Sequence, residues 1–144
     1  MKAVVLARIA PHSYPALIHA PETAIPAGFP SPSKDYQTTE IDLNEHLGLR
    51  KTSCYLIRVM GHSMTQAGIF DGDEIIVDRA IRPRDGHIIV AIVDGEMTVK
   101  RLRFAPNGGV FLMPENPEFP IFEIPELSDF TVWGVVTRCL HHVR

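Results

Sequence analysis

A serine on a predicted turn and a lysine on a predicted strand are the two residues of this chain that could do chemistry together. Ser63 lies in GHSM at 61–64, and Lys100 lies in TVKRL at 98–102. A serine hydroxyl is a poor nucleophile until a base takes its proton, and a lysine is that base only while its amine is neutral. Burial lowers the pKa of a lysine because desolvation disfavours the charged form. Acyl-transfer chemistry on this pair therefore requires Lys100 to lie against apolar surface beside Ser63.

The chain around Ser63 is predicted to run from a strand into a turn. Residues 54–60 read CYLIRVM, a run rich in β-formers that stops at Gly61. On a sharp bend after this strand, the backbone N–H groups of His62 and Ser63 could form an oxyanion hole. The alternative is that Ser63 caps a short helix over residues 64–67. The two interpretations are compatible, because a helix N-terminus also supplies N–H donors.

A β-hairpin is predicted to carry Lys100. Residues 87–93 are a nearly continuous apolar run, and residues 96–104 are a second run of strand length. The Asp-Gly pair at 94–95 between them is a strong hairpin signal. The sequence therefore predicts that Lys100 lies in the second strand of this hairpin.

Strand alternation bears on the burial of Lys100 without settling it. Lys100, Leu102 and Phe104 share one face, and the two apolar residues favour burial of that face. The opposite face also carries apolar residues, so a lysine in water remains the alternative. Arg101 is excluded as the base because a guanidinium is not deprotonated in a protein. His62 beside the serine is a second candidate base, although adjacent residues usually point apart.

A segment upstream of both residues has the composition of a cleavage site. Residues 25–32 read IPAGFPSP, and their prolines restrict φ and push the preceding residues toward extended geometry. Proteases bind extended substrates, a shallow pocket accepts Ala27, and Gly28 lets the backbone approach a nucleophile closely. The alternative is a Pro/Gly-rich linker, and a linker can also contain a cleavage site.

The composition predicts one small domain. The chain has 144 residues, of which 45% are hydrophobic, so we expect a single core plus an arm. A net charge of −3 and a pI near 6.1 argue against direct sequence-specific nucleic-acid binding. The apolar run at residues 2–8 is too short for a signal peptide, and no run reaches transmembrane length. We expect a cytoplasmic protein without a membrane segment.

No metal and no cofactor are expected. Turn chemistry explains Asp71 and Asp73, because no matching His/Cys ligand set accompanies them. The histidines at 141–142 are expected to lie in water. Cys54 and Cys139 fall in apolar strands, and we expect buried free thiols.

Further strands complete a mostly β prediction. They are expected over residues 74–78, 110–113, 119–124 and 130–140, and residues 41–49 begin a helix or a strand.

Together these segments resemble the LexA/UmuD-like family of self-cleaving Ser/Lys peptidases. The resemblance runs from about Ala27 to Val143 and rests on the joint occurrence of nine short segments. They are AGFPSP at 27–32, IDLN at 41–44, GHSM at 61–64, GI at 68–69, DGD at 71–73, VA at 90–91, VDGE at 93–96, TVKRL at 98–102 and VWGVV at 132–136.

The resemblance implies a fold and a domain organisation. The fold would be mostly β, a small LexA/signal-peptidase-like β domain with an extended N-terminal arm. Residues 1–27 would be the cleavable arm, residues 28–53 a linker retained after cleavage, and residues 54–144 the peptidase-like domain.

The resemblance also implies an activity. The chain would be a serine endopeptidase that cuts itself between Ala27 and Gly28, with Ser63 as the nucleophile and Lys100 as the general base. RecA filaments on single-stranded DNA would stimulate the cut during the SOS response. The product, residues 28–144, would be a homodimer and the accessory subunit of a UmuC-type error-prone translesion polymerase.

The sequence departs from the family pattern at two positions. His62 stands where an acidic residue is common before the serine, and Ala27 stands where UmuD-like chains usually have cysteine. These departures leave the resemblance intact and put only the preference at the cleavage site in doubt.

Three other functions fit the sequence less well than a self-cleaving peptidase. A LexA-like self-cleaving regulator needs a helix-turn-helix domain, but only 27 residues precede Gly28, and four of them are prolines. A type I signal peptidase needs a membrane anchor, and none is found. A catalytically silent polymerase-binding module would not need the intact Ser63, Lys100 and Ala27-Gly28 that this chain carries.

Overall fold

The fold is taken from a computed structural model, which describes residues 1–10, 14–21, 27–28, 38–49, 51–125 and 128–144. The described chain is mostly strand, as the sequence predicted. It divides into two compact units, one of Met1–Ile9 with Thr52–Arg144 and one of Ala10–Lys51.

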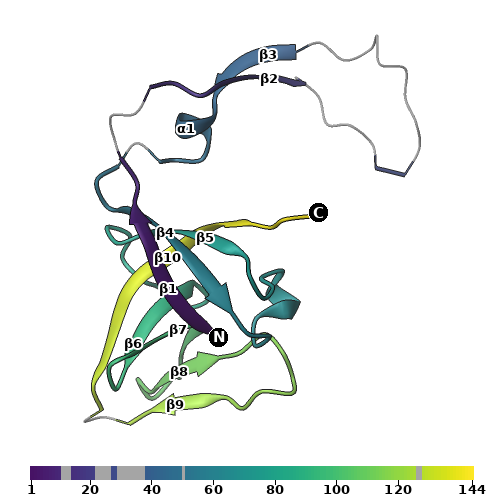
Figure 1. The fold of residues 1–144 in the computed structure, drawn as a ribbon. Coiled ribbons are helices and arrows are strands. Elements are labelled where there is room, and N and C mark those ends of the chain that lie inside the picture. The colour runs from purple at the N-terminus through teal and green to yellow at the C-terminus, as the bar shows by residue number, and fades with distance from the viewer. Residues whose placement is uncertain (11–13, 22–26, 29–37, 50, 126–127) are drawn as a thin grey trace. The chain divides into compact units, whose positions relative to one another are not determined.

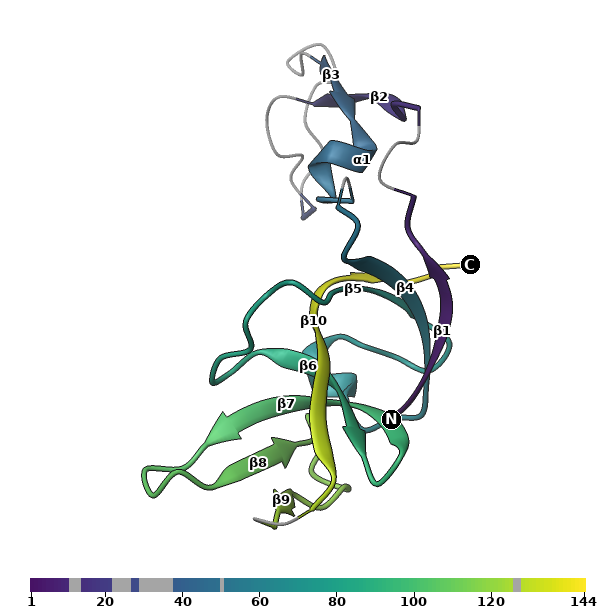
Figure 2. The same ribbon diagram turned by 90° about the vertical axis from the view of Figure 1, so that its left-hand side faces the viewer.

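The larger unit is built on one eight-stranded antiparallel sheet (Figures 1 and 2). Its order is β1-β4-β5-β10-β6-β7-β8-β9, and Lys2 of β1 also pairs with Thr98 of β7, so the sheet curls back toward its first strand. The strands are β1 (Lys2–Arg8), β4 (Cys54–Met60), β5 (Glu74–Asp78), β6 (Ile88–Val93), β7 (Glu96–Phe104), β8 (Val110–Met113), β9 (Phe122–Ile124) and β10 (Phe130–Leu140).

Most of the predicted strands are confirmed, and two of them begin later than expected. β6 begins one residue later than expected, at Ile88. The strand expected over residues 119–124 forms only from Phe122. Pro120 lies in the missing part, and a proline has no N–H to donate to a sheet.

The pairing of β1 with β4 was not foreseen. Residues 1–27 were treated as one arm, yet Met1–Ile9 belongs to the same compact unit as the peptidase-like sheet. The reason is the short run AVVLA at 3–7, whose β-branched and apolar residues suit a strand. Whether the chain divides at residues 27 and 53 after a cut stays a prediction.

The smaller unit contains a second, two-stranded antiparallel sheet. β2 (Leu17–Pro21) pairs with β3 (Thr38–Asp42), from Leu17 opposite Asp42 to Pro21 opposite Thr38. α1 (Leu43–His46) follows β3 directly, and the Asp42 side chain accepts a hydrogen bond from the Asn44 N–H at its start. The sequence predicted either a helix or a strand at the start of residues 41–49. This segment contains the end of β3 and all of α1.

Two clusters of buried side chains form the core of the larger unit. One is built around Ile57, Val59, Met64 and Val99, and the other around Ile89 and neighbours on β7, β8 and β10. The first cluster lies directly under the turn that carries Ser63, since Met64 is wholly buried in it.

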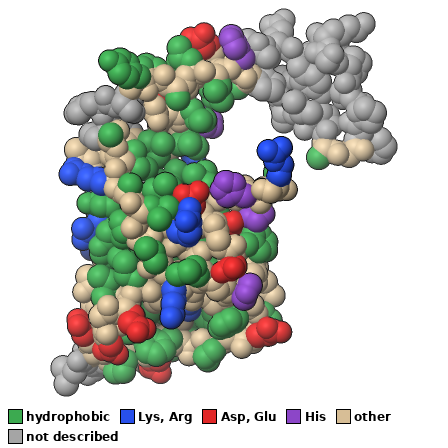
Figure 3. Space-filling view, viewed as in Figure 1, with side chains coloured by type: hydrophobic (Ala, Val, Ile, Leu, Met, Phe, Trp, Pro, Cys, Tyr) green, Lys and Arg blue, Asp and Glu red, His purple; other side chains and the backbone are tan. Residues whose placement is uncertain are grey.

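On the face shown in Figure 3, lysine and arginine side chains are scattered among hydrophobic and acidic ones rather than gathered into a basic stripe.

Candidate active site

The turn after β4 places Ser63 at the surface of the core. Gly61 has a φ of 107°, a conformation that side chains rarely adopt, and this allows the sharp bend after Met60. The Gly61 N–H donates to Asp71 Oδ1 at 2.7 Å, which ties the bend to the following turn. Ser63 has no exposed surface. The hydrogen bond from the Gly61 N–H to Asp71 is consistent with the prediction that Asp71 serves turn structure.

Ser63 does not cap the short helix that follows, so that alternative is wrong. The helix is a single 3₁₀ turn, η2 (Thr65–Ala67), and its N-cap is Met64, without a side-chain cap bond. The Ser63 hydroxyl is instead directed at amines.

Lys100 reaches Ser63 from the second strand of the predicted hairpin. Its Nζ donates to Ser63 Oγ at 3.0 Å, to Thr98 Oγ1 at 3.2 Å and to the Val99 carbonyl at 3.1 Å. The Lys100 side chain is partly buried, and this burial lowers the pKa of its amine below the ordinary lysine value. The distance and the direction of the shift are those that a serine–lysine pair needs. Of the two apolar residues on the face of Lys100, Leu102 is buried and Phe104 is 49% exposed, so strand alternation alone did not decide the burial of that face.

A second amine lies at the same hydroxyl. The Met1 α-amine donates to Ser63 Oγ at 2.9 Å. Burial, together with the neighbouring Lys100 amine, lowers the pKa of the Met1 α-amine to about 5. The Met1 carbonyl accepts from the Val99 N–H at 3.1 Å and from Thr98 Oγ1 at 3.0 Å. The start of β1 therefore lies in the candidate site.

The loop after β8 holds the nucleophile turn by its backbone. The Glu115 N–H donates to the Ser63 carbonyl at 2.7 Å, and the Gln66 N–H donates to the Glu115 carbonyl at 2.8 Å. Asn116 Nδ2 donates to the His62 carbonyl at 2.8 Å. These contacts fix the turn on both sides of Ser63. We call Glu115 and Asn116 the loop clamp.

Arg101 connects the loop clamp to the strand that carries Lys100. Its Nε forms an ion pair with Glu115 Oε1, and its Nη1 donates to the Gly86 carbonyl at 2.6 Å. Nucleophile turn, clamp and lysine strand are thus joined by hydrogen bonds independent of the Lys100–Ser63 contact. No sequence pattern indicated that Glu115 and Asn116 hold the turn of Ser63, because residues 115–117 suggest only a break between strands.

His62 does not contact the nucleophile side chain in the described part of the chain. His62 is exposed, and its backbone carbonyl accepts a hydrogen bond from Asn116 of the loop clamp. The hydroxyl of Ser63 receives its hydrogen bonds from two amines instead. The geometry therefore favours an amine over the imidazole as the base.

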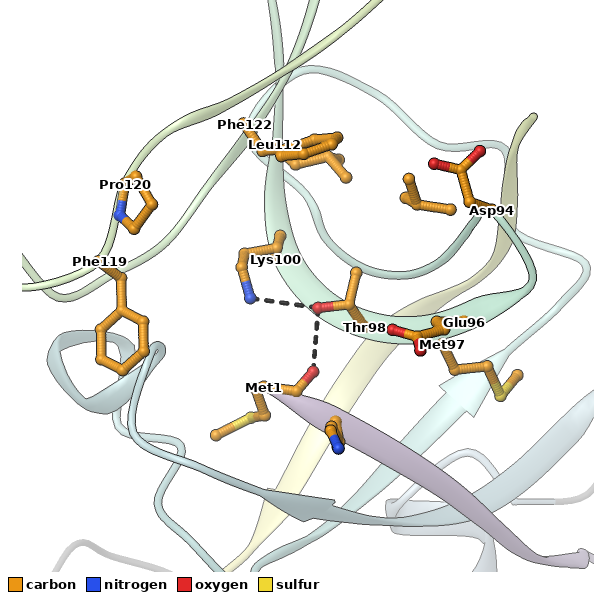
Figure 4. A pocket seen from close by; sticks show the side chains of 12 residues that line it. Met1, Asp94, Glu96, Met97, Thr98, Lys100, Leu112, Phe119, Pro120 and Phe122 are labelled. Carbon is orange, nitrogen blue, oxygen red and sulfur yellow. Dashed lines mark hydrogen bonds between the residues drawn. The ribbon is translucent and has the colours of Figure 1, made fainter. Parts of the chain in front are cut away.

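A cavity of about 570 Å³ opens beside Lys100 (Figure 4). Lys100 and Thr98 face it from β7, with Phe119 and Pro120 on one side. Its apolar lining includes Met97, Leu112, Phe119, Pro120 and Phe122. An apolar cavity beside Lys100 could accept the side chains of a bound peptide.

The predicted cleavage site is only partly described. Ala27 and Gly28 are both exposed and form a bend in the smaller unit. A side chain added at Gly28 would meet nothing within 4 Å. The flanking residues 25–26 and 29–32 lie outside the described residues.

One expectation about the cysteines needs correction. Cys54 is buried as predicted, but Cys139 is exposed, and the two form no disulfide. Cys139 lies near the end of β10, where its Sγ contacts Asp73 Oδ2 at 3.3 Å. His141 is exposed as expected, and its Nδ1 also contacts Asp73 Oδ1 at 2.5 Å.

Within the described residues, no group of three or more His, Cys, Asp or Glu side chains could hold a metal ion. No helix in that part of the chain is long and apolar enough to cross a membrane.

Comparison with known proteins identifies the family. The model of the Peptidase S24-like family matches residues 18–137, a range that contains the nucleophile turn, the lysine strand and the loop clamp. The chain belongs to the Peptidase S24-like family. Its resemblance to self-cleaving Ser/Lys peptidases is thereby confirmed at the level of the family.

Individual relatives support the same assignment. The chain is 40% identical to protein SamA of Salmonella typhimurium strain LT2, over 94% of this chain and 95% of that protein. It is 42% identical to protein ImpA of Escherichia coli, over 82% and 79%. It is 38% identical to the LexA repressor of Bordetella parapertussis, over 77% of this chain but only 50% of the repressor.

Proposed function

We propose that this S24-family protein is a serine endopeptidase that cuts its own chain between Ala27 and Gly28, with Ser63 as the nucleophile and Lys100 as the general base. The observation that carries the proposal is the 3.0 Å contact between Lys100 Nζ and Ser63 Oγ in a partly buried setting. A base within hydrogen-bond reach, with a pKa moved toward neutrality, is what an activated serine requires.

The chemistry follows from these two groups. Neutral Lys100 Nζ takes the proton of Ser63 Oγ while the oxygen attacks the carbonyl carbon of Ala27. The resulting ammonium gives a proton to the departing amine of Gly28, which leaves an ester between Ser63 and Ala27. Lys100 then takes a proton from water, and the hydroxide formed breaks the ester to a free Ala27 carboxylate and the Ser63 hydroxyl.

The tetrahedral intermediates of this reaction carry a negative oxygen that needs donors. We assign this role to the backbone N–H groups of His62 and Ser63. In the described part of the chain, neither N–H has another acceptor. The loop clamp holds the carbonyls of these two residues and so fixes the peptide planes of the turn. Preorganised donors of this kind stabilise the transition state more than the ground state.

The relatives support a role in the SOS response. SamA and ImpA are 40–42% identical to this protein over most of the chain. We infer that RecA filaments on single-stranded DNA stimulate the cut in the cytoplasm. Residues 28–144 would then form a homodimer and serve a UmuC-type translesion polymerase as its accessory subunit, without direct sequence-specific contact with DNA.

Two other functions are weaker. A LexA-like regulator is favoured by the 38% identity to a LexA repressor, but that match covers only half of the repressor. A catalytically silent polymerase-binding module would not require the buried serine–lysine contact. Both differ from the proposal in a measurable way, since the first binds operator DNA and the second does not cut itself.

The experiment is a time course of the purified chain, read by intact mass, with and without RecA filaments on single-stranded DNA. Two products are expected, residues 1–27 and residues 28–144. The lowered pKa of Lys100 sets the pH dependence: below it the amine is protonated, so the rate rises about tenfold per pH unit as pH approaches it. Absence of any cut with and without filaments, or a product that does not begin at Gly28, would contradict the proposal.

A further inference from the structure

The bond between Ala27 and Gly28 lies inside two nested antiparallel strand pairs. β2 and β3 flank it directly, and β1 and β4 flank that pair in turn. A cut there leaves β1 and β2 on the fragment of residues 1–27. Their partners, β3 and β4, remain on the fragment of residues 28–144. Cleavage of the bond therefore breaks no contact of either strand pair.

In the outer pair, β1 is held against β4 by backbone hydrogen bonds. β1 pairs with β4 from Lys2 opposite Met60 to Arg8 opposite Tyr55, and the Ile9 N–H donates to the Cys54 carbonyl at 2.9 Å. β1 and β4 lie side by side in both ribbon views (Figures 1 and 2).

Further contacts anchor the ends of β1. Met1 and Ala3 pack against the core cluster of the larger unit, and the Met1 carbonyl accepts two hydrogen bonds from β7. Arg8 Nε donates to the Thr52 carbonyl at 2.9 Å at the other end. β1 is thus bound as a strand of the sheet and not only by its covalent link.

The inner pair holds the fragment a second time. β2 pairs with β3 over its whole length. Before β2, the Ala16 N–H donates to Asp42 Oδ1 at 3.0 Å and the Ala16 carbonyl accepts from the Leu43 N–H at 2.7 Å. The Tyr14 carbonyl accepts from Asn44 Nδ2 at 3.1 Å. These contacts all join residues before the bond to residues after it.

We propose that residues 1–27 remain bound to residues 28–144 after the cut, with the edge of β4 and the adjoining end of β7 as a binding site for the strand β1. This inference rests on the proposed function for the position of the cut. Both strand pairs are partly exposed to solvent, since Val4 of β1 is 48% exposed and Leu17 of β2 is 58% exposed. Two linked contacts hold together far better than either does alone, because the second association is intramolecular.

The proposal separates cleavage from release. While β1 stays in place, Met1 remains at Thr98 and Val99 beside Lys100, in the lining of the cavity. The edge of β4 also stays covered until the fragment leaves. Release of the strand, and not the chemical step, exposes this edge.

The test nicks the chain without using its own activity. A recognition sequence for a site-specific protease is inserted between Ala27 and Gly28 in a Ser63→Ala chain, which is cut and passed over a size-exclusion column at micromolar concentration. The expected result is co-elution of both fragments in native buffer, with separation in denaturant. Elution of residues 1–27 as a free peptide in native buffer would overturn the proposal.

Matched variants test whether the two strand pairs are responsible. Ala3→Asp puts a charge on the buried face of β1, and Val4→Asp puts the same charge on its exposed face as the control. Asp42→Ala removes the acceptor of the Ala16 N–H at the inner pair. Ala3→Asp with Asp42→Ala should weaken retention by about 100-fold or more, and Val4→Asp by less than about threefold. Full retention in the double variant would overturn the assignment to these strands.

Because an added protease makes the nick, the result does not depend on whether Ser63 is a nucleophile. A nicked chain that keeps its fragment, together with a wild-type chain that never cuts itself, would contradict only the proposed function. Self-cleavage followed by immediate loss of residues 1–27 would contradict only the present inference.

Discussion

The turn that carries Ser63 and the bend that carries Ala27-Gly28 differ in almost every physical respect. Ser63 has no exposed surface, and its turn is held by a hydrogen bond to the Asp71 carboxylate and by hydrogen bonds from Glu115 and Asn116. Ala27 and Gly28 are exposed, and a side chain added at Gly28 would meet nothing within 4 Å. The turn proposed to supply the nucleophile is thus fixed by its own hydrogen bonds, whereas the bend proposed to be cut is open to solvent.

This difference decides where substitutions act. At the nucleophile turn, a change alters both the folded protein and the reaction, because the same hydrogen bonds serve both. At the bend, a change alters the reaction alone. The predictions below test this contrast, beginning with the largest expected effect.

Removal of either partner of the serine–lysine pair should have the largest effect. Ser63→Ala should abolish self-cleavage, and Lys100→Ala should slow it by about 10²–10⁴-fold, the usual contribution of a general base. Arg103→Ala is the matched control on the same strand, since its ion pair with Asp85 is exposed and worth little. Intact mass over time measures the rates. Nearly normal cleavage in Lys100→Ala would move the base to the Met1 α-amine or to His62, and His62→Ala would distinguish these two.

Substitution at the bend should affect the reaction and spare the fold. Gly28→Val should slow cleavage by at least about tenfold, because the added side chain hinders the close approach of the backbone to the nucleophile. The melting temperature should stay that of the wild type, since the position has open space around it. An equal loss of thermal stability in this variant would show that the bend is packed, and the contrast between the two regions would fail.

Loosening the loop clamp should give an intermediate effect on both rate and stability. Asn116→Ala removes the 2.8 Å hydrogen bond to the His62 carbonyl and should cost about 0.5–1.5 kcal/mol of unfolding free energy. Because this bond positions the turn, the cleavage rate at high pH should also fall, by about threefold to tenfold. Denaturant unfolding and the plateau of the pH–rate profile measure the two effects. An unchanged plateau would confine Asn116 to a structural role.

The smallest effect on cleavage is expected at Asp73, whose side chain contacts Phe70, Cys139 and His141. Burial alone would raise the pKa of the Asp73 carboxyl, but hydrogen bonds from the Phe70 N–H, His141 and Cys139 outweigh it and hold that pKa below its ordinary value. A lowered folded-state pKa stabilises the protein above the ordinary pKa of an aspartate, about 3.9, and this stability is lost as pH falls through the folded value.

Asp73→Ala should therefore destabilise the fold at neutral pH by about 1–3 kcal/mol, because it leaves the part-buried Phe70 N–H and two side-chain donors without their acceptor. The difference from the wild type should shrink only below about pH 4. Thermal unfolding across pH measures this, and the cleavage rate of the folded variant should be unchanged. A large loss of cleavage in fully folded Asp73→Ala would contradict the view that this cluster serves structure alone.

Local patterns were sufficient to predict the strand that carries Lys100. The Asp-Gly pair forms the expected tight turn, with φ of 49° at Asp94 and 81° at Gly95. The two apolar runs beside it pair in the register that such a turn sets, with Val93 opposite Glu96. The bounds of β4 and β10 were predicted for the same reason, since each is a continuous run of β-formers between turn residues.

Contacts between segments far apart in the chain could not be predicted in this way. Nothing in residues 2–8 specifies β4 as a partner, because a short apolar strand fits many edges. The bonds from Glu115 to Ser63 and from Asn116 to His62 depend on the closure of the sheet, which no local pattern encodes. The proximity of Ser63 and Lys100 was reached only through resemblance to a family, and the 3.0 Å distance then agreed with it.

The central claim is that burial beside Ser63 lowers the pKa of the Lys100 amine, and an NMR titration of the lysine side chains tests it most directly. The Lys100 signal is assigned by its loss in Lys100→Arg and followed from about pH 6 to about pH 12, a range that brackets the ordinary lysine value near 10.4. The account predicts a midpoint for Lys100 clearly below that value. A midpoint at or above it would contradict the account, because the amine would then carry its proton at the pH where the chain is proposed to cut itself.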